Sequence, residues 1–342
     1  MGVDPPAATF CAMPESMSKS TSMIEIEGLT RRFGPIAAVA GIDLTVAKGE
    51  VLGFLGPNGA GKSTTMKMVT GYLAPSSGRV RICGHDVEAD PIAAQRCIGY
   101  LPEGAPAYAD MTPRQFLSFI AEVRGFAGPA VNERVQAVVA KTELDLVLDQ
   151  TIDTLSKGFK RRVGLAQAIL HDPPVLIMDE PTDGLDPNQK HAVRTLLRTM
   201  APDKAIIIST HLLEEVEAIC TRAVIIDRGR VVADGTPGEL VARSRHHNAV
   251  TLALPPVQAE MAKARIKAMN GVAAIEQTMR SDGLVELTAF PKSGALLIED
   301  VSALVVAEKW DVKELYAEAG RLDEVFRAIT THDATRARES RS

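Results

Sequence analysis

The sequence predicts an α/β protein with a mixed sheet core, in which parallel strands are covered by helices on both faces, followed by a smaller α+β domain. Three observations predict this class. The runs VLIMDE (175–180) and AIIIST (205–210) are almost entirely apolar, which is typical of strands buried on both faces. A glycine-rich loop at 56–64 stands between an apolar strand and a helix-competent stretch. From Ala249 the pattern runs strand, helix, strand, strand, helix, strand.

Length and composition set the broad class. A chain of 342 residues is long enough for about two domains. The net charge of -5 gives no electrostatic attraction to a polyanion, so we expect no nucleic-acid partner. The four cysteines are scattered without metal-ligand spacing, and we interpret them as reduced thiols of a cytosolic protein. We find no signal peptide and no apolar run of the roughly 18 residues that span a bilayer, so any membrane role must come from a partner.

The chain divides into parts by composition and by period. Residues 1–22 are rich in Pro, Ser, Ala and Met without a sustained period, and SRHHN (244–248) interrupts the apolar pattern as a linker does. We therefore expect, in chain order, a disordered tail (1–22), a main domain (23–243) with a helical subdomain at about 105–165, the linker, an accessory domain (249–330) of ferredoxin-like type, and a frayed tail (331–342).

The main domain begins with short strands. The segments 23–33 and 41–56 alternate or cluster apolar residues, with Lys48-Gly49 offering turn chemistry, so they predict a small antiparallel section. Residues 77–87 predict another strand pair, and the helical spacing of apolar residues within 113–148 predicts helices. The later strands of this domain are expected at 175–180, 205–210 and 223–235.

The accessory domain is predicted from the same change of period. Its strands are expected at 249–254, 272–279, 283–290 and 310–317, and its helices at 256–269, 293–307 and 322–329. Because a βαββαβ fold hosts many functions, this shape assigns none.

The glycine-rich loop has the chemistry of a phosphate site. It reads Gly56-Pro57-Asn58-Gly59-Ala60-Gly61-Lys62-Ser63-Thr64, which satisfies G-x-x-x-x-G-K-[ST]. The glycines allow successive N–H groups to point at phosphate oxygens, and the following helix adds its dipole. Lys62 would bridge the β- and γ-phosphates, and the Ser63 hydroxyl would ligate Mg²⁺. The loop alone leaves kinases, GTPases, motors and helicases open.

Further downstream, polar residues stand at helix starts and strand ends. Ser156 and Gly158, in LSKGF (155–159), precede a basic helix and predict an anion site. Asp179 and Glu180 end an apolar strand, where Asp179 would hold Mg²⁺ through water and Glu180 would orient the attacking water. Taken singly, Ser156 could be a helix cap and the two acids could be solvated strand ends.

Two more polar positions follow. Asp186 lies in the turn GLDP (184–187), and His211 follows the next strand, where its imidazole could bond the γ-phosphate. A satisfied surface histidine is the alternative for His211. In this order and after a phosphate loop, the set favours nucleotide hydrolysis. A GTPase is disfavoured because the sequence has no N-K-x-D base-reading motif.

These segments resemble the nucleotide-binding domain of the ABC ATPase family over about residues 24–240. By this resemblance the Walker A motif is 56–64, the signature 155–159, Walker B 175–180, the D-loop 184–187 and the H-loop His211. The resemblance implies an ATPase that uses ATP and Mg²⁺, with Ser156 and Gly158 gripping the γ-phosphate of ATP on a second copy or a close paralogue. It also implies an integral membrane permease as partner, and therefore a cytoplasmic, peripheral position on the inner face of the membrane.

Three positions need separate comment. Phe33 corresponds to the family's adenine-stacking aromatic, with a core phenylalanine as the alternative. Ile98–Pro102 fits the Q-loop, but Glu103 follows where glutamine is usual, and its carboxylate can face Mg²⁺ and the permease. Lys157 and Phe159 replace the usual signature residues, as in subunits of ABC type 2 exporters that resemble gliding-motility and multidrug export ATPases, which implies export. The alternative is a soluble ABC-type ATPase acting on ribosomes or nucleic acid.

The remaining features have simpler interpretations. The run Lys160-Arg161-Arg162 predicts a solvated helix face, with contact to the nucleotide or to a partner as the alternative. We interpret His246-His247 as linker residues rather than metal ligands, because adjacent side chains of an extended chain point in different directions. The accessory domain could be regulatory or could extend the dimer contact, and its simplest role is to stabilise the dimer.

Overall fold

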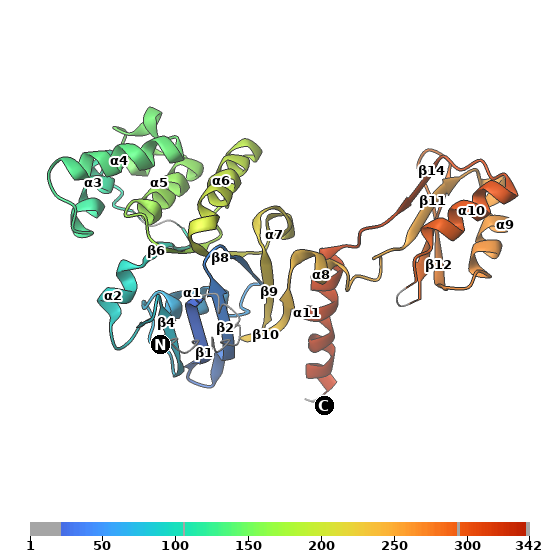
Figure 1. The fold of residues 1–342 in the computed structure, drawn as a ribbon, viewed down its shortest axis with the longest axis horizontal. Coiled ribbons are helices and arrows are strands. Elements are labelled where there is room, and N and C mark those ends of the chain that lie inside the picture. The colour runs from blue at the N-terminus through green and yellow to red at the C-terminus, as the bar shows by residue number, and fades with distance from the viewer. Residues whose placement is uncertain (1–21, 105–106, 293–294, 340–342) are drawn as a thin grey trace, which may run out of the picture.

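The computed structural model describes residues 22–104, 107–292 and 295–339 (Figure 1). Two sheets and most of the helices form the first part of the molecule, and a third sheet with two helices stands to one side of it. The predicted disordered tail lies outside the described residues, apart from Ser22, which begins the first strand.

A six-stranded sheet forms the centre of the first part. Its order is β10-β9-β3-β8-β7-β6, with five parallel strands and β10 antiparallel at one edge. The strands are β3 (Val51–Leu55), β6 (Ile98–Leu101), β7 (Val175–Asp179), β8 (Ala205–Thr210), β9 (Arg222–Asp227) and β10 (Arg230–Gly235). Every residue of β7 and β8 is buried, which confirms the prediction of strands covered on both faces. Strand β3 is also buried throughout, but it pairs in parallel with β8 and β9, so the prediction that placed residues 51–55 in the antiparallel section is wrong.

The two faces of this sheet pack against different layers, because side chains alternate along each strand. Leu176 and Met178 belong to a hydrophobic cluster with the helices drawn above the sheet in Figure 1. Val175 and Ile177 belong to a second cluster with Met66 and with the first antiparallel sheet. Both faces are therefore closed to water, and polar chemistry is confined to the strand ends.

The first antiparallel sheet has the order β2-β1-β4-β5. Its strands are β1 (Ser22–Phe33), β2 (Ile36–Ala47), β4 (Ser77–Ile82) and β5 (His85–Asp86). The helices around the two sheets are α1 (Lys62–Val69), α2 (Pro91–Arg96), α3 (Pro113–Val123), α4 (Pro129–Thr142), α5 (Lys157–Ile169), α6 (Pro187–Met200), α7 (Leu213–Ile219) and α8 (Pro237–Val241), with 3-10 turns at Asp145–Val147, Ile152–Thr154 and Ala201–Asp203. Helices α3, α4 and α5 pack together as the helical subdomain.

The third sheet belongs to the accessory domain and has the order β12-β13-β11-β14, with every pair antiparallel. Its elements are β11 (Val250–Leu254), α9 (Pro256–Lys267), β12 (Val272–Met279), β13 (Val285–Pro291), α10 (Ile298–Glu308) and β14 (Glu314–Ala317). Side chains from α9, α10 and one face of this sheet form its core, in which Trp310 is buried.

The last helix, α11 (Leu322–Glu339), returns to the first part of the molecule (Figure 1). Leu322 is 2% exposed and shares a cluster with Val216, Ala233 and Leu240, and α11 contacts α8. A helix at this position was expected within the accessory domain, but its apolar face covers the main domain instead. The helix also continues to Glu339, through residues expected to be a frayed tail.

Within the described residues, we find no helix with the length and apolar character that a membrane crossing requires.

Candidate functional site

The phosphate-loop segment connects β3 to α1 and needs glycine at two places. Gly61 caps α1 with φ 105°, a left-handed conformation, and a Cβ there would lie 2.4 Å from the carbonyl oxygen of Ala38. A Cβ on Gly56 would lie 2.5 Å from the carbonyl oxygen of Ile226. The loop is therefore held tightly against its neighbours, with the start of α1 directed into the space that it encloses.

Lys62 is the cation of this loop. Its side chain is 7% exposed, and Nζ donates hydrogen bonds to the carbonyl oxygens of Gly56 at 2.7 Å and Pro57 at 3.2 Å. Burial lowers the pKa of Lys62, and the carboxylates of Glu180, Asp179 and Glu103 act in the opposite direction. The ammonium is thus within electrostatic reach of all three predicted acids.

The predicted carboxylates stand at the carboxyl end of β7, beside the end of β8. Asp179 is 2% exposed, and its Oδ1 accepts a hydrogen bond from Ser209 Oγ. Glu180 Oε1 is 2.8 Å from His211 Nδ1, so the structure brings these two predicted residues into direct contact. The histidine therefore fixes the direction of the Glu180 carboxylate.

The backbone of Glu180 adopts a left-handed conformation, with φ 52°. This conformation is unfavourable for a residue with a Cβ, and such residues cluster at functional sites. The Glu180 N–H donates to the carbonyl oxygen of Ser209 at 3.0 Å, and the Glu180 carbonyl oxygen accepts from the Asp183 N–H at 3.1 Å. The carboxylate therefore leaves the line of the strand at the point where the strand ends.

The signature and D-loop segments are joined to each other within the chain. Lys157 Nζ pairs with Asp183 at 2.7 Å, and this pairing lowers the pKa of the Asp183 carboxyl. Ser156 caps α5 by accepting from the Phe159 N–H at 3.3 Å. Asp186 caps α6, with Gln189 completing a capping box. Gly158 faces α6, where a Cβ would lie 2.8 Å from the Gln189 side chain.

The remaining predicted positions lie at the edges of the site. Phe33 ends β1 and is 47% exposed, so it is not the core residue of the alternative interpretation, and the Arg31 guanidinium lies 4.8 Å from its ring centroid. Glu103 is exposed in the loop after β6, and Ser63 and Thr64 are half-buried in the first turn of α1. Among the described residues, we find no cluster of three or more His, Cys, Asp or Glu that could hold a metal.

The prediction of a solvated helix face at 160–162 is wrong for two of its three residues. Arg161 is 5% exposed and Arg162 8% exposed. Arg161 donates to the carbonyl oxygens of Pro102, Asp179 and Glu180. Arg162 pairs with Glu143 at 2.8 Å inside the helical subdomain. A run of basic residues does not reveal that their side chains are buried, because the carbonyl oxygens that accept from Arg161 belong to segments distant in the sequence.

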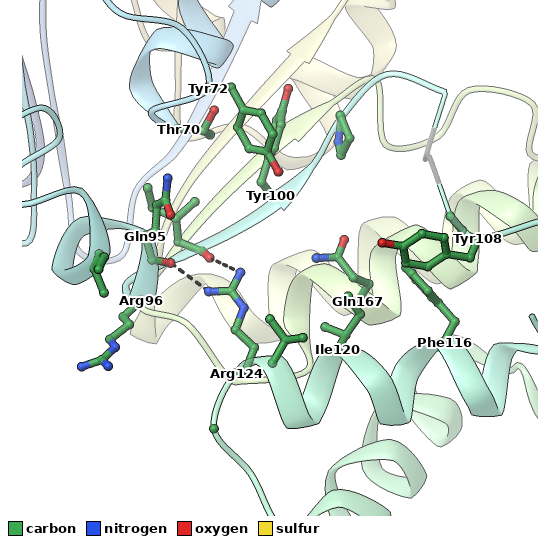
Figure 2. A pocket seen from close by; sticks show the side chains of 16 residues that line it. Thr70, Tyr72, Gln95, Arg96, Tyr100, Tyr108, Phe116, Ile120, Arg124 and Gln167 are labelled. Atoms are coloured by element: carbon green, nitrogen blue, oxygen red, sulfur yellow. Dashed lines mark hydrogen bonds between the residues drawn. The ribbon is translucent and has the colours of Figure 1, made fainter.

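A second feature of the main domain is a cavity of about 710 Å³ between α2, β6 and α3 (Figure 2). The rings of Tyr72 and Tyr100 lie 5.6 Å apart on one side, and Tyr108 and Phe116 lie on the other. Arg124 connects the two sides by donating to the carbonyl oxygens of Gln95 at 2.9 Å and Ile98 at 3.3 Å. The sequence pattern does not predict this cavity, because its residues are spread from Thr70 to Gln167.

The polar groups of the cavity are partly buried. The Tyr100 hydroxyl is buried and has no hydrogen-bond partner among the described residues, and burial raises its pKa. Burial also lowers the pKa of Arg124. Because β6 leads directly into Pro102 and Glu103, the cavity lies next to the loop that faces the phosphate site.

The site fits the groups that the sequence predicts. The glycine-rich loop and the first turn of α1 present backbone N–H donors to a phosphate, and the helix adds its dipole. Lys62 adds a positive charge. Asp179 and Ser63 carry oxygen atoms of the kind that Mg²⁺ prefers as ligands.

Comparison with known proteins gives consistent matches. Residues 39–183 match the ABC transporter family. The chain is 31% identical over 318 residues to the daunorubicin/doxorubicin resistance ATP-binding protein DrrA of Streptomyces peucetius, which covers 93% of this chain and 95% of that protein. It is 35% identical over 223 residues to the Nod factor export ATP-binding protein I of Ralstonia nicotianae, which covers 65% of this chain and 70% of that protein.

A solved structure of the ATP-binding subunit of an ABC transporter is also similar. It superimposes with a TM-score of 0.60 and is 31% identical, over 64% of this chain and 91% of that chain. The share of this chain that it covers is close to the size of the main domain.

Proposed function

The chain belongs to the ATP-binding subunits of the ABC transporter family, and we propose that two copies of it enclose ATP between them to drive a separate membrane permease. Hydrolysis of ATP is the activity of this family. The observation that carries the proposed site is the contact between Glu180 and His211 at the end of β7, within electrostatic reach of the Lys62 ammonium.

The residues would divide the reaction between them. The loop at 56–64 binds the phosphates through its backbone N–H groups, and Lys62 moves from its own loop carbonyls to the β- and γ-phosphates. Bound Mg²⁺ would neutralise phosphate charge, held by Ser63 and Asp179, with Glu103 facing it. Glu180 accepts the proton of the attacking water, and His211 keeps the Glu180 carboxylate directed at that water.

The geometry within one chain supports a dimeric site. Helix α5 and helix α1 pack on opposite faces of the central sheet (Figure 1). Among the described residues, no hydrogen bond joins Ser156 or Gly158 to the phosphate loop of the same chain. A second copy or a close paralogue would supply them from across the interface, together with Asp186 of the D-loop, and Phe33 would stack on the adenine from its exposed position.

The cavity beside β6 supports a permease as the partner. Exposed apolar side chains surround it, including Ile92 and Val123, each 66% exposed, and Tyr72, 75% exposed. Such a patch is typical of a protein interaction site. A permease segment docked there would touch the strand that leads to Glu103, which would connect transport to hydrolysis. The protein would then lie on the cytoplasmic face of the membrane.

Export is the direction that the relatives support. DrrA is named for drug resistance and the Ralstonia protein for export of Nod factor. The match to DrrA extends through most of the accessory domain, because it covers 93% of this chain. We infer that this domain is ferredoxin-like, as its strand order supports, and that it stabilises the dimer.

The test is Glu180→Gln. This change removes the proton acceptor but keeps the size of the side chain, so we expect kcat to fall by about 10²- to 10⁴-fold while ATP still binds. Size-exclusion chromatography with light scattering should show a dimer only when ATP is present. Normal steady-state ATP hydrolysis by the purified variant would overturn the role of Glu180, and a monomer in saturating ATP would overturn the enclosed dimer.

A further inference from the structure

Arg161 connects three segments that come together only in the folded chain. It lies one turn into α5, directly after the signature, and is 5% exposed. Its Nη1 donates to the carbonyl oxygen of Pro102 at 2.9 Å, and its Nη2 donates to the carbonyl oxygens of Asp179 and Glu180. One guanidinium thus joins the signature helix to the Q-loop and to the end of Walker B.

The hydrogen bond from Arg161 to Glu180 is made to a residue whose backbone conformation is unfavourable. Glu180 has φ 52°, a conformation that residues other than glycine adopt only when their surroundings hold them. Its carbonyl oxygen accepts from Arg161 and from the Asp183 N–H. Without the guanidinium, the peptide after Glu180 would lose one of its two donors and could turn, and the carboxylate would turn with it.

The charge at Arg161 is compensated locally. Burial lowers its pKa, and the carboxylates of Asp183, Asp179 and Glu180 act against this shift. A guanidinium stays protonated in proteins, so the side chain remains a cation with a planar fork of donors. The two ends of this fork reach Pro102 and the tip of β7 together, which the single point charge of a lysine ammonium does not do.

We propose that Arg161 is a positioning residue for ATP hydrolysis, which holds the backbone of Glu180 in its reactive conformation and ties it to the Q-loop at Pro102. This inference rests on the role of Glu180 proposed above. Because the hydrogen bonds of Arg161 within the described part of the chain all go to backbone oxygens, it acts through Glu180 and not on the nucleotide. Its loss should therefore slow the chemical step and leave ATP binding unchanged.

The experiment compares Arg161→Lys with Arg162→Lys, a matched control. Both arginines are buried on α5, but Arg162 bonds within the helical subdomain to Glu143. For Arg161→Lys we expect kcat to fall about tenfold or more with KM for ATP unchanged, since small displacements of reacting groups have large effects on rate. For Arg162→Lys we expect both constants to stay close to those of the unaltered protein. Arg161→Gln, which keeps a neutral donor, provides a second variant if the lysine variant does not fold.

A second measurement separates positioning from assembly. In the Glu180→Gln background, Arg161→Lys should still form the ATP-dependent dimer. An unchanged kcat in Arg161→Lys would overturn the inference, and so would loss of ATP binding or of the dimer, because Arg161 would then shape the signature loop instead. Failure of the proposed function would appear separately, as absence of ATP hydrolysis in the unaltered protein or as normal hydrolysis by Glu180→Gln.

Discussion

The main and accessory domains use their sheets in opposite ways. All five residues of β7 are buried, and polar chemistry begins only where the strand ends, at Asp179 and Glu180. Strand β13 instead alternates, with Val285 and Leu287 buried and Glu286 half-buried between them. A sheet covered on both faces collects its reactive groups at the strand ends, whereas the accessory sheet, apart from the fully buried β11, carries polar groups along its strands.

This difference supports the proposal that the chemistry belongs to the main domain and that the accessory domain has a supporting role. The accessory domain contains the only tryptophan of the chain, Trp310, which is buried in its core. Tryptophan fluorescence therefore reports on this domain alone, while ATP binding reports on the other. Urea unfolding followed by these two signals therefore measures the stability of each domain separately.

The first prediction concerns which domain α11 stabilises. Leu322→Ala removes a 2% exposed side chain from the cluster with Leu240, and we expect it to lower the free energy of unfolding of the main domain by about 2–5 kcal/mol. The Trp310 fluorescence transition in urea should not move, while the loss of ATP binding should occur at lower urea. The control is Leu296→Ala, on a side chain that is 68% exposed. Equal shifts in both transitions would show that the domains unfold as one unit.

The helical character of α11 could be predicted from the sequence, but its packing partner could not. Leu322, Val325, Phe326 and Ile329 recur at helical spacing, so an apolar face could be predicted. That pattern does not say which surface the face covers, and the helix packs on the main domain beyond the whole accessory domain. Local periodicity specifies an element and its buried side, but the partner of that side depends on the path of the entire chain.

The functional site divides in the same way. The phosphate loop and the acids at the end of β7 could be predicted, because their chemistry requires particular residue types at fixed spacing. The role of Arg161 could not be predicted, because its partners are the carbonyl oxygens of Pro102, Asp179 and Glu180. Every residue type carries a backbone carbonyl, so the residue types do not indicate such partners. The aromatic cavity beside β6 was missed for a related reason, since it is assembled from distant segments.

The second prediction tests whether ATP binding depends on the phosphate loop and not on the stability of the accessory domain. Lys62→Ala removes the buried ammonium, and we expect the affinity for ATP to fall about 10- to 100-fold. This factor corresponds to the loss of one charge-assisted hydrogen bond, which contributes about 1.5–3 kcal/mol. Titration with a fluorescent ATP analogue measures this change. Lys67→Ala, on the exposed side of the same helix, is the control. Unchanged affinity in Lys62→Ala would remove the phosphate site from this loop, whereas the Trp310 transition should be the same in all three proteins.

The third prediction concerns the junction between the domains and depends on pH. Burial acts to raise the pKa of Glu324, but hydrogen bonds from Ser244 and His246 outweigh it, and the pKa is lowered. The ionised form is therefore favoured by folding. Its stabilisation is present above the unfolded-state pKa of about 4.3 and is lost as the pH falls through the lower folded-state pKa.

We therefore expect Glu324→Gln to lower the free energy of unfolding of the main domain, measured in urea at pH 7, by about 1 kcal/mol, and to have less effect as the pH approaches 4. Asp323→Asn is a matched control, because Asp323 is also an acid in the first turn of α11 but pairs with Arg327 on the same helix. A difference between Glu324→Gln and the unaltered protein that grows toward pH 4 would contradict this account of Glu324.

The smallest expected effect comes from removing the accessory domain while keeping α11. The Glu318 N–H donates to the carbonyl oxygen of Ala249 at 2.7 Å, and the Asn248 N–H donates to the carbonyl oxygen of Glu318 at 2.9 Å, so the two chain segments that enter and leave this domain lie side by side. Joining Ala249 to Glu318 through a few glycines would excise the domain without moving the last helix. Because Glu180 and Lys62 belong wholly to the main domain, we expect kcat to stay within about twofold of the full chain.

The same excision in the Glu180→Gln background measures what the accessory domain contributes. If it only stabilises the dimer, the ATP-dependent dimer still forms but dissociates at a higher protein concentration, as sedimentation velocity would show. A large fall in kcat per chain at saturating protein and ATP would instead mean that the open-faced sheet acts on the reaction itself. In that case the division between a domain with reactive strand ends and a domain with a solvated sheet would not be a division of function.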